Sequence, residues 1–186
     1  MQFITATFEV VEVPLREADL YPVSQTQEAI SVAVDEITSP ERVRNYFGVS
    51  LLEQGILPVN ITVSNHGEHR VTVKPADVLL RRGTEVVDPL PIAWMAELAK
   101  RRAWLREETE EQINAFFSGL AFAETVLFPH DSYQGALFFP LDYESERDRF
   151  FSLIRLFEQG RLKLEVVVTD LETHQRIHFG PFSLSQ

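Results

Sequence analysis

The segment Val59-Asn60-Ile61-Thr62-Val63-Ser64 decides the fold, because each of its apolar residues is separated from the next by one small polar residue. Successive side chains of a β-strand point to opposite faces, so this order predicts a half-buried strand. A turn-forming stretch follows at 65–69, and the alternation resumes at Val71-Thr72-Val73-Lys74. We therefore expect residues 59–74 to form a β-hairpin.

Short apolar runs of the same kind recur along the chain. They lie around 8–13, 29–37, 78–80, 85–87, 122–128, 135–140, 162–168 and 177–179, with turn-forming residues between them. We count about nine strands in all, and this spacing is typical of an antiparallel β-sandwich. The alternation of strands and helices that a parallel sheet requires is missing from the sequence.

Two shorter stretches depart from the strand pattern. Ser39 is a helix-capping residue followed by proline, and Gly48 is a helix stop signal, so a short helix is expected at 40–47. Residues 145–159 place apolar side chains at helical spacing. This second pattern favours a helix, with a strand as the alternative because short runs rich in phenylalanine are ambiguous.

The longest departure is an insertion at about 90–119. Basic residues, which favour helix C-termini, come before a run of glutamates, which favour helix N-termini. A capping-box sequence begins at Thr109. These features predict two helices, at about 91–106 and 110–118, with a break near 107–109. One continuous helix is the alternative, since neither glycine nor proline enforces the break.

The composition supports one domain over residues 1–186. The chain carries 17 basic and 28 acidic residues, a formal net charge of −11, and 45% hydrophobic residues, without any cysteine. At this size folding buries about 70% of the chain's surface, which is enough for one core without disulfides. The longest basic cluster, Lys100-Arg101-Arg102, is soon followed by glutamates, so nucleic-acid binding is not expected.

The sequence also bears on membrane association and export. No apolar run reaches the ~20 residues needed to span a bilayer, so no transmembrane segment is expected in this chain. The N-terminus has no basic start followed by an apolar stretch, so we do not expect these residues to act as a signal peptide. Export would then require a leader that has been removed.

The histidines do not form a strong metal-binding pattern. His66 and His69 flank a turn and would need Glu68 as a third ligand for a metal ion. His174 and His178 have a spacing that can bind zinc on a helix. Their surroundings predict a strand or loop instead, and four residues of a strand span roughly 13 Å, too far for one zinc ion.

Catalytic patterns are equally weak. A hydrolase would have to use His130 beside Asp131, and the sequence has no nucleophile elbow to accompany them. The acidic runs at 107–111 and 142–148 are too polar to raise the pKa of one carboxyl group for acid–base catalysis. We therefore expect no catalytic residue, no cofactor and no metal ion.

Aromatic residues offer the clearest indication of a binding surface. The chain has 14 phenylalanines, which would fill the core or, in the alternative, line an apolar groove between a helical cap and a sheet. Trp94 and Trp104 lie in the predicted helical insertion, off its apolar line. Exposed tryptophan often anchors protein interfaces, so Trp94 and Trp104 are the candidate partner interface.

Two groups of residues carry a resemblance to known proteins. The first is Tyr46-Phe47-Gly48, Gly55-Ile56-Leu57-Pro58-Val59 and Asn65, and the second is Pro129 with Gly135-Ala136-Leu137-Phe138-Phe139-Pro140. The first resembles a motif of uncharacterised bacterial envelope proteins, many of them lipoproteins. The second is similar to the paired strands of small immunoglobulin-like bacterial domains. The resemblance covers roughly 29–90 and 122–184, although the lipidation cysteine is absent. It implies an immunoglobulin-like sandwich and an envelope location.

These observations together predict a mainly β protein, an immunoglobulin-like antiparallel β-sandwich with an inserted helical pair. We expect a non-enzymatic binding or interaction module with a protein partner, on the cell envelope if a leader has been removed and otherwise in the cytoplasm. The alternative is a carrier of a small apolar ligand or lipid, and a hydrolase comes third. The sequence is also compatible with a homo-oligomer, because an edge strand of a sandwich can pair with a strand of a second copy.

Overall fold

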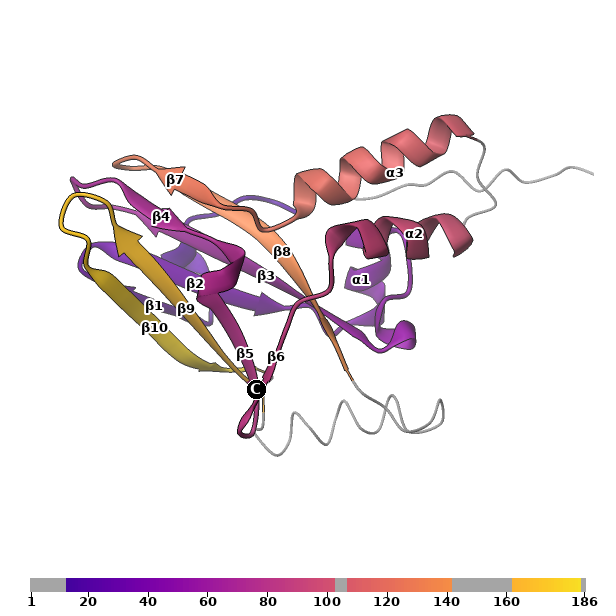
Figure 1. Ribbon diagram of the computed structural model, residues 1–186, viewed down its shortest axis with the longest axis horizontal. Coiled ribbons are helices and arrows are strands. Elements are labelled where there is room, and N and C mark those ends of the chain that lie inside the picture. Colours follow the sequence, from indigo (N-terminus) through magenta and orange to yellow (C-terminus); the bar gives the residue numbers. More distant parts are fainter. Residues whose placement is uncertain (1–12, 103–106, 142–161, 185–186) are drawn as a thin grey trace, which may run out of the picture.

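The computed structural model describes residues 13–102, 107–141 and 162–184, and their strands form two antiparallel sheets (Figure 1). The four-stranded sheet has the order β1–β2–β3–β8, with strands Ser24–Gln27, Ile30–Glu36, Ile56–Asn65 and Ser132–Pro140. The six-stranded sheet contains β4 (Val71–Val73), β5 (Val78–Arg82), β6 (Glu85–Val87), β7 (Thr125–Leu127), β9 (Leu162–Asp170) and β10 (Arg176–Ser183).

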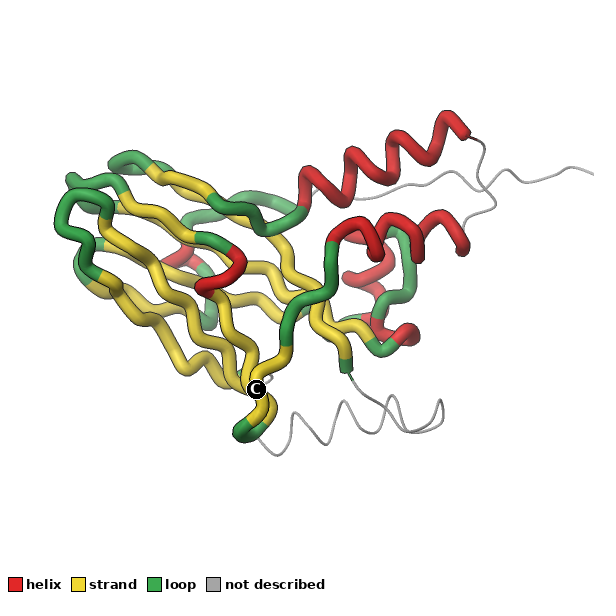
Figure 2. Tube along the Cα trace, viewed as in Figure 1, coloured by secondary structure: helices red, strands yellow, loops and turns green. Residues whose placement is uncertain are grey.

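Helices pack at one end of the four-stranded sheet, on the face that points away from the six-stranded sheet (Figure 2). They are α1 (Pro40–Phe47), α2 (Ile92–Arg102) and α3 (Glu107–Leu120), and Leu52 of the 3-10 helix η2 (Leu52–Gln54) packs against their core. The 3-10 helix η1 (Ala18–Leu20) lies beside β1, β2 and β3, whereas η3 (Pro75–Asp77) lies beside β9 of the six-stranded sheet. The prediction of a mainly β fold with two antiparallel sheets is confirmed. The strand order does not establish an immunoglobulin-like topology.

Side-chain alternation along β3 and β8 creates two cores instead of one. Leu57 and Phe139 lie in the core between the sheets, whereas Ile56 and Phe138 lie in the core under the helices. The helix residues buried in this second core are Val43, Phe47, Met95, Ala96, Ala99, Ile113 and Phe117. The ring of Phe138 meets those of Phe47 and Phe117 edge to face, at centroid distances of 5.4 and 6.1 Å. Both faces of these two strands are therefore used for packing.

The strand predicted at 59–64 is present as β3, but the expected exposure of its polar face is wrong. Every residue of β3 is buried, including Asn60, Thr62 and Ser64. The alternation correctly separates the two faces of the strand. It does not reveal that a second layer of the same chain covers the polar face.

The hairpin predicted at 59–74 is also wrong, because β3 and β4 belong to different sheets. The side chain of Asn65 shapes the connection between β3 and β4. Its Nδ2 donates to the carbonyls of His69 at 2.8 Å and Phe128 at 3.1 Å, and its Oδ1 accepts from the amide of Gly67 at 3.0 Å. These bonds direct the chain from one sheet to the other. Apolar alternation cannot distinguish the two outcomes, because both sheets face the same core.

The short helix predicted at 40–47 is confirmed as α1. The side chain of Ser39 accepts from the amide of Arg42 at 3.4 Å, Pro40 occupies the first turn, and Gly48 ends the helix with a φ of 69°. A positive φ of this size favours glycine, which has no Cβ to clash with the preceding turn. Local capping rules therefore sufficed for this element.

The predicted insertion contains two helices, α2 and α3, which pack against each other. The break expected near 107–109 is misplaced, because α3 already begins at Glu107 and Thr109 lies within it. A bridge from α2 to α3 is formed by Lys100, whose Nζ lies 2.9 Å from a carboxylate oxygen of Glu97 and 3.6 Å from one of Glu110. The helix predicted at 145–159, and the opening strand up to residue 12, lie outside the described residues.

A chain crossing between the sheets covers the free edge of β8. The amide of Phe122 donates to the carbonyl of Ala136 at 2.9 Å, and the hydroxyl of Tyr133 accepts from the amide of Ala123 at 2.6 Å. This crossing lies so close to the strand that a Cβ atom on Gly135 would be 2.5 Å from the Cα of Phe122. Glycine is therefore required at position 135 by the close approach of two backbones.

At the opposite edge of the four-stranded sheet, side chains of β1 form hydrogen bonds to β10 of the six-stranded sheet. Gln25 accepts a hydrogen bond through its Oε1 from the amide of Gly180 at 2.8 Å, and Gln27 donates through its Nε2 to the carbonyl of His178 at 2.9 Å. Gly180 and His178 both lie on β10, so the two sheets are connected along this edge by glutamine amides. We name this the glutamine seam.

Substitution of Gly135→Ala is expected to destabilise the protein by about 2 kcal/mol, because the added methyl group overpacks against the 121–123 crossing. Gly119→Ala is the matched control: no atom lies within 4 Å of the added Cβ, and alanine favours the helix. Urea unfolding of both variants measures the difference. Equal stabilities would contradict the close approach at Gly135.

Candidate functional site

The outer face of the four-stranded sheet, which points away from the six-stranded sheet, is divided into an apolar and a polar zone. The apolar zone lies under the helices and includes Ile56 and Phe138. The polar zone continues along the same strands and consists of Ser31, Asn60, Thr62, Ser64, Ser132 and Gln134. The segment 13–21, which contains η1, covers the polar zone.

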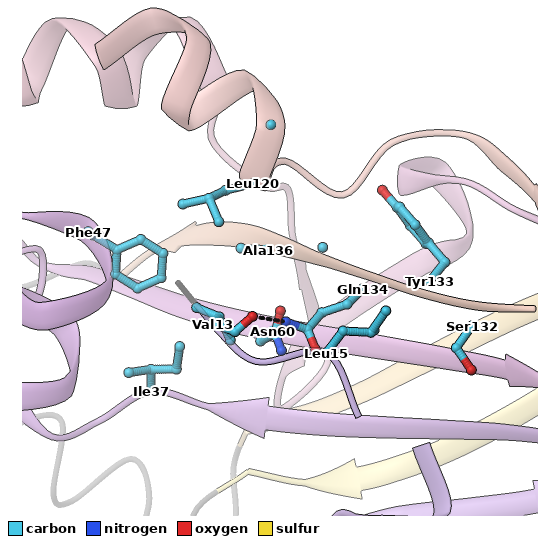
Figure 3. Close-up of a pocket in the computed structure, with 12 residues that line it drawn as sticks. Val13, Leu15, Ile37, Phe47, Asn60, Leu120, Ser132, Tyr133, Gln134 and Ala136 are labelled. Carbon is cyan, nitrogen blue, oxygen red and sulfur yellow. Dashed lines mark hydrogen bonds between the residues drawn. The ribbon is translucent and has the colours of Figure 1, made fainter. Parts of the chain in front are cut away.

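Hydrogen bonds hold the segment 13–21 on the polar zone. The Oγ of Ser64 accepts from the amide of Ala18 at 2.9 Å. Gln134 uses both ends of its amide: its Oε1 accepts from the hydroxyl of Tyr21 at 3.0 Å. Its Nε2 donates to the carbonyl of Val13 at 3.3 Å, as the dashed line in Figure 3 shows. Because buried polar groups need partners, these contacts explain why the covering segment is tolerated on a polar surface.

A cavity of about 270 Å³ lies where the two zones meet (Figure 3). Its lining comprises Val13, Leu15, Ile37, Phe47, Asn60, Gly119, Leu120, Ser132, Tyr133, Gln134, Gly135 and Ala136. The apolar walls come from the covering segment, α1 and α3, and the polar groups come from β3 and β8. We name this the Asn60 cavity.

The amide of Asn60 is the unusual group in this lining. Asn60 is only 4% exposed, and its Nδ2 has no hydrogen-bond partner among the described residues. A buried donor without a partner costs about 1–3 kcal/mol, so such groups are rare in folded proteins and call for a reason. The position of Asn60 in the lining of the cavity provides one, since a ligand or a water molecule there can accept from this amide.

Among the described residues, the charged pair beside Asn60 is formed by Asp35 and Arg42. Asp35 is directly opposite Asn60 on β2, but both of its carboxylate oxygens are engaged by Arg42, at 3.2 and 2.5 Å. The hydrogen bond to Asp35 raises the pKa of Arg42, so the guanidinium stays charged and balances the carboxylate. The ion pair therefore leaves little net charge beside the amide.

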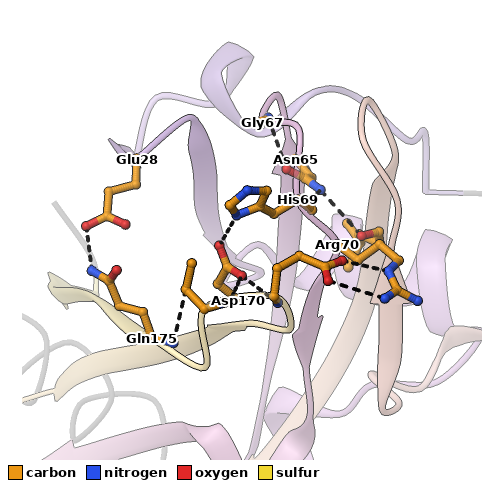
Figure 4. Close-up of polar contacts among 10 residues, drawn as sticks. Glu28, Asn65, Gly67, His69, Arg70, Asp170 and Gln175 are labelled. Atoms are coloured by element: carbon orange, nitrogen blue, oxygen red, sulfur yellow. Dashed lines mark hydrogen bonds and ion pairs between the residues drawn. The ribbon is translucent and has the colours of Figure 1, made fainter.

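A second polar cluster lies between the loops 66–70 and 170–175 (Figure 4). The Nδ1 of His69 lies 2.8 Å from the Oδ2 of Asp170, and the Nε of Arg70 lies 2.9 Å from the Oε1 of Glu172. The amides of Glu172 and Thr173 donate to the other oxygen of Asp170, at 2.8 and 2.9 Å. These bonds fix the β3–β4 connection against the turn between β9 and β10.

The pKa values in this cluster move in opposite directions. Burial alone would raise the pKa of Asp170, but hydrogen bonds from the Thr173 amide, from His69 and from the Glu172 amide outweigh it and lower the pKa to about 2. The hydrogen bond to Asp170, followed by its negative charge, raises the pKa of His69. The pair is therefore fully charged in mildly acidic solution.

The sequence identified these histidines, but the structure pairs them differently. His69 contacts Asp170 instead of sharing a site with His66 and Glu68. His66 lies beside Glu17 and Asp19, with the three potential ligand atoms all within 4.8 Å of one another. Sequence reasoning missed this group because its members come from segments far apart in the chain. All three side chains are exposed, and such groups commonly occur without a metal ion.

The other histidines lie at turns or on an exposed strand face. His130 is exposed, and the neighbouring Asp131 accepts from the amide of Phe128 at 3.0 Å, so its carboxylate shapes a turn. His174 lies in the turn before β10 and His178 on β10, in agreement with the predicted strand or loop. The acidic run at 142–148 lies outside the described residues.

The two tryptophans of the candidate partner interface differ in what the structure describes. Trp94 lies on α2 and is 47% exposed, which is high for so large an apolar side chain. Trp104 lies outside the described residues. The partner interface at Trp94 and Trp104 therefore stays a prediction.

Comparison with known proteins gives structural similarity only. No family model and no curated protein matches the chain. The yjhA protein of Bacillus subtilis is similar over 84% of this chain and 94% of its own, with a TM-score of 0.43 and 11% identity. A candidate lipoprotein, ycdA of Bacillus subtilis subsp. subtilis str. 168, is similar over 92% of this chain, with a TM-score of 0.45 and 13% identity. This chain covers only 40% of the ycdA chain.

The sequence resemblance pointed to bacterial envelope proteins, many of them lipoproteins. The comparisons support it as far as a structural similarity to these two Bacillus proteins. Among the described residues, no helix combines the length and the apolar character needed to cross a membrane.

Replacing Asn60 by leucine is expected to stabilise the ligand-free protein by about 1 kcal/mol, because it removes a buried donor that has no partner among the described residues. Ser64→Ala is the matched control on the same face of β3. It leaves the buried amide of Ala18 without its acceptor and should destabilise by about 1–3 kcal/mol. Urea unfolding distinguishes the two effects, and a strongly destabilised Asn60→Leu would show that the amide is satisfied.

The pair of His69 and Asp170 is expected to stabilise the fold over a defined pH range. Because the pKa of His69 is raised, its contribution is complete below about pH 6.5 and is lost as the pH rises through the folded value. Because the pKa of Asp170 is lowered, its contribution is complete above about pH 4 and is lost as the pH falls toward 2. The largest effect lies between these limits.

His69→Ala should therefore lower the Tm more at pH 5.5 than at pH 8.5. His178→Ala is the control, since its exposed side chain has no carboxylate partner among the described residues. NMR titration of the His69 ring measures its pKa directly. A difference in Tm that does not depend on pH would show that the ion pair is absent.

Proposed function

We propose that the protein is a non-enzymatic binding module that takes up a small, largely apolar ligand in the Asn60 cavity. The observation that carries this proposal is the combination of apolar walls with one buried amide whose donor has no partner among the described residues. Sites for small molecules are typically concave, mostly apolar, and supplied with a few polar groups that orient the ligand. Of the non-enzymatic hypotheses drawn from the sequence, this favours the carrier of a small apolar ligand.

The size of the cavity limits the ligand. A cavity of about 150 Å³ in another protein accommodates benzene, so about 270 Å³ corresponds to roughly ten non-hydrogen atoms. This is below the usual range for drug-sized ligands, about 300–1,000 Å³. A monocyclic compound with a short chain fits this estimate, whereas a complete lipid would extend beyond it.

The polar groups of the cavity favour binding over catalysis. The hydroxyl of Tyr133 donates to the carbonyl of Ala121 at 3.2 Å, and the hydroxyl of Ser132 pairs with that of Ser64 at 2.7 Å. Both hydroxyls thus have structural partners. A nucleophile needs an adjacent general base, and the described lining contains neither histidine nor carboxylate.

The immunoglobulin-like topology and the envelope location, both expected from the sequence, are also part of the proposal. We propose that the two packed sheets derive from an immunoglobulin-like sandwich, which the Greek-key-like separation of β3 from β4 and of β7 from β8 into different sheets supports. We also propose an envelope location, which rests on the sequence resemblance. Binding of a protein partner through Trp94 remains the second candidate, and the exposure of this side chain supports it.

Uptake of a small molecule is tested with butylbenzene and 4-phenylbutan-2-one as probes, by saturation-transfer NMR on the full chain. We expect both to bind in competition with each other, with dissociation constants in the micromolar to millimolar range for ligands of this size. Leu120→Trp fills part of the cavity and should weaken binding at least tenfold.

Leu20→Trp is the matched control, because Leu20 is 67% exposed and does not line the cavity. It should leave the affinity for both probes unchanged. Failure of both probes to bind the wild-type protein would overturn the proposed function.

A further inference from the structure

We infer that the ligand of the Asn60 cavity is uncharged and presents one hydrogen-bond acceptor, such as a ketone or ester carbonyl, to the Nδ2 of Asn60. This inference rests on the proposed function and defines its ligand class. It joins three observations: an amide donor without a described partner, the lack of charged side chains among the described lining residues, and an ion pair of Asp35 and Arg42 beside the amide.

The requirement for an acceptor follows from the chemistry of the amide group. The Nδ2 of asparagine only donates hydrogen bonds, so a ligand that satisfies it must offer a lone pair. The described groups nearby already have partners: Gln134 contacts Tyr21 and Val13, and Ser64 contacts Ala18 and Ser132. The Nδ2 of Asn60 is therefore the buried side-chain donor in this lining that has no partner among the described residues and can orient a ligand.

The requirement for neutrality follows from the surroundings of the amide. None of the described residues that line the cavity is Asp, Glu, Lys, Arg or His. A charged group that leaves water without a countercharge is strongly disfavoured. Arg42 does not serve as a countercharge for an anion, because Asp35 engages its guanidinium. The formal net charge of −11 adds repulsion against anions.

The location of the amide also fixes how the ligand would lie. Asn60 belongs to β3 in the floor of the cavity, whereas Phe47 and Leu120 come from the helices on its other side (Figure 3). The acceptor would therefore point to the sheet, and the apolar body would lie against the helix side chains. Such an orientation uses both zones of the outer face.

Three probes of matched shape separate these requirements. 4-Phenylbutan-2-one carries a neutral carbonyl acceptor. Butylbenzene has a methylene group in place of this carbonyl, and 3-phenylpropanoate has a carboxylate in place of the acetyl group. Because the probes differ in hydrophobicity, the informative quantity is the ratio of affinities for ketone and butylbenzene, compared between wild type and Asn60→Leu. This comparison isolates the hydrogen bond to residue 60.

We expect Asn60→Leu to reduce the ketone-to-butylbenzene affinity ratio about tenfold, as for the loss of one buried hydrogen bond. Wild-type protein should bind 3-phenylpropanoate at pH 7 at least tenfold more weakly than the ketone. Thr62→Val removes a hydroxyl, and not the amide, from the same face of β3 and should leave the ratio unchanged. If Asn60→Leu fails to fold, Asn60→Ala, which also removes the donor, provides the same comparison.

The outcomes distinguish this inference from the function on which it rests. An unchanged ratio in Asn60→Leu, with both neutral probes still bound, overturns the inference, because the amide then contacts only water, and leaves the binding module intact. Equal or tighter binding of 3-phenylpropanoate overturns the requirement for neutrality. Binding of none of the three probes overturns the proposed function itself.

Discussion

A row of polar side chains on the outer face of β3 has to be hydrogen-bonded once other parts of the chain cover it. Thr62 and Ser64 meet this requirement through β8 and through the segment 13–21. This need for hydrogen-bond partners explains why the segment 13–21, with η1, lies over the polar row. It also explains why the outer face is divided into two zones. A buried polar row is stable only when its partners are in place, so it fixes the register of the covering segment more narrowly than an apolar surface would.

Asn60 differs from the other members of this row, because its Nδ2 has no partner among the described residues. It lies where the helices and the segment 13–21 meet. The helices cover the apolar zone and the segment 13–21 covers the polar zone, but neither closes the boundary. A fold optimised for stability alone would place an apolar residue at position 60. Proteins often accept a local cost of this kind where a ligand later offsets it, which is why the boundary attracts a functional interpretation.

Local sequence rules predicted the elements better than their assembly. The capping signals around α1 and the alternation in β3 depend on neighbouring residues, and both elements formed where expected. The destination of the chain after β3 depends instead on the side chain of Asn65, which bonds to the distant Phe128 carbonyl. No pattern in 65–69 distinguishes this connection from a hairpin turn. The requirement for glycine at position 135 was equally hard to predict, because it arises from the close approach of the Phe122 backbone.

The candidate site was harder to predict for the same physical reason. In the sequence, Asn60 alternates with apolar residues just as Thr62 and Ser64 do, and nothing in the pattern marks it as the member of the row that lacks a described partner. The predicted groove between the helical insertion and a sheet stays a prediction. The Asn60 cavity is lined by Gly119 and Leu120 of that insertion and by Phe47 of α1. Its polar floor was not foreseen, because the covering segment near Val13 was expected to be a strand.

The glutamine seam has a consequence for self-association. An open sheet margin offers unpaired backbone groups as a template on which another molecule can add a strand. Here two of the groups on β10 are occupied by Gln25 and Gln27 of the same chain, through flexible amides that imitate a neighbouring strand without extending the sheet. A second molecule would have to displace both amides to dock there. Backbone-mediated pairing between copies is thus disfavoured at these two positions of β10.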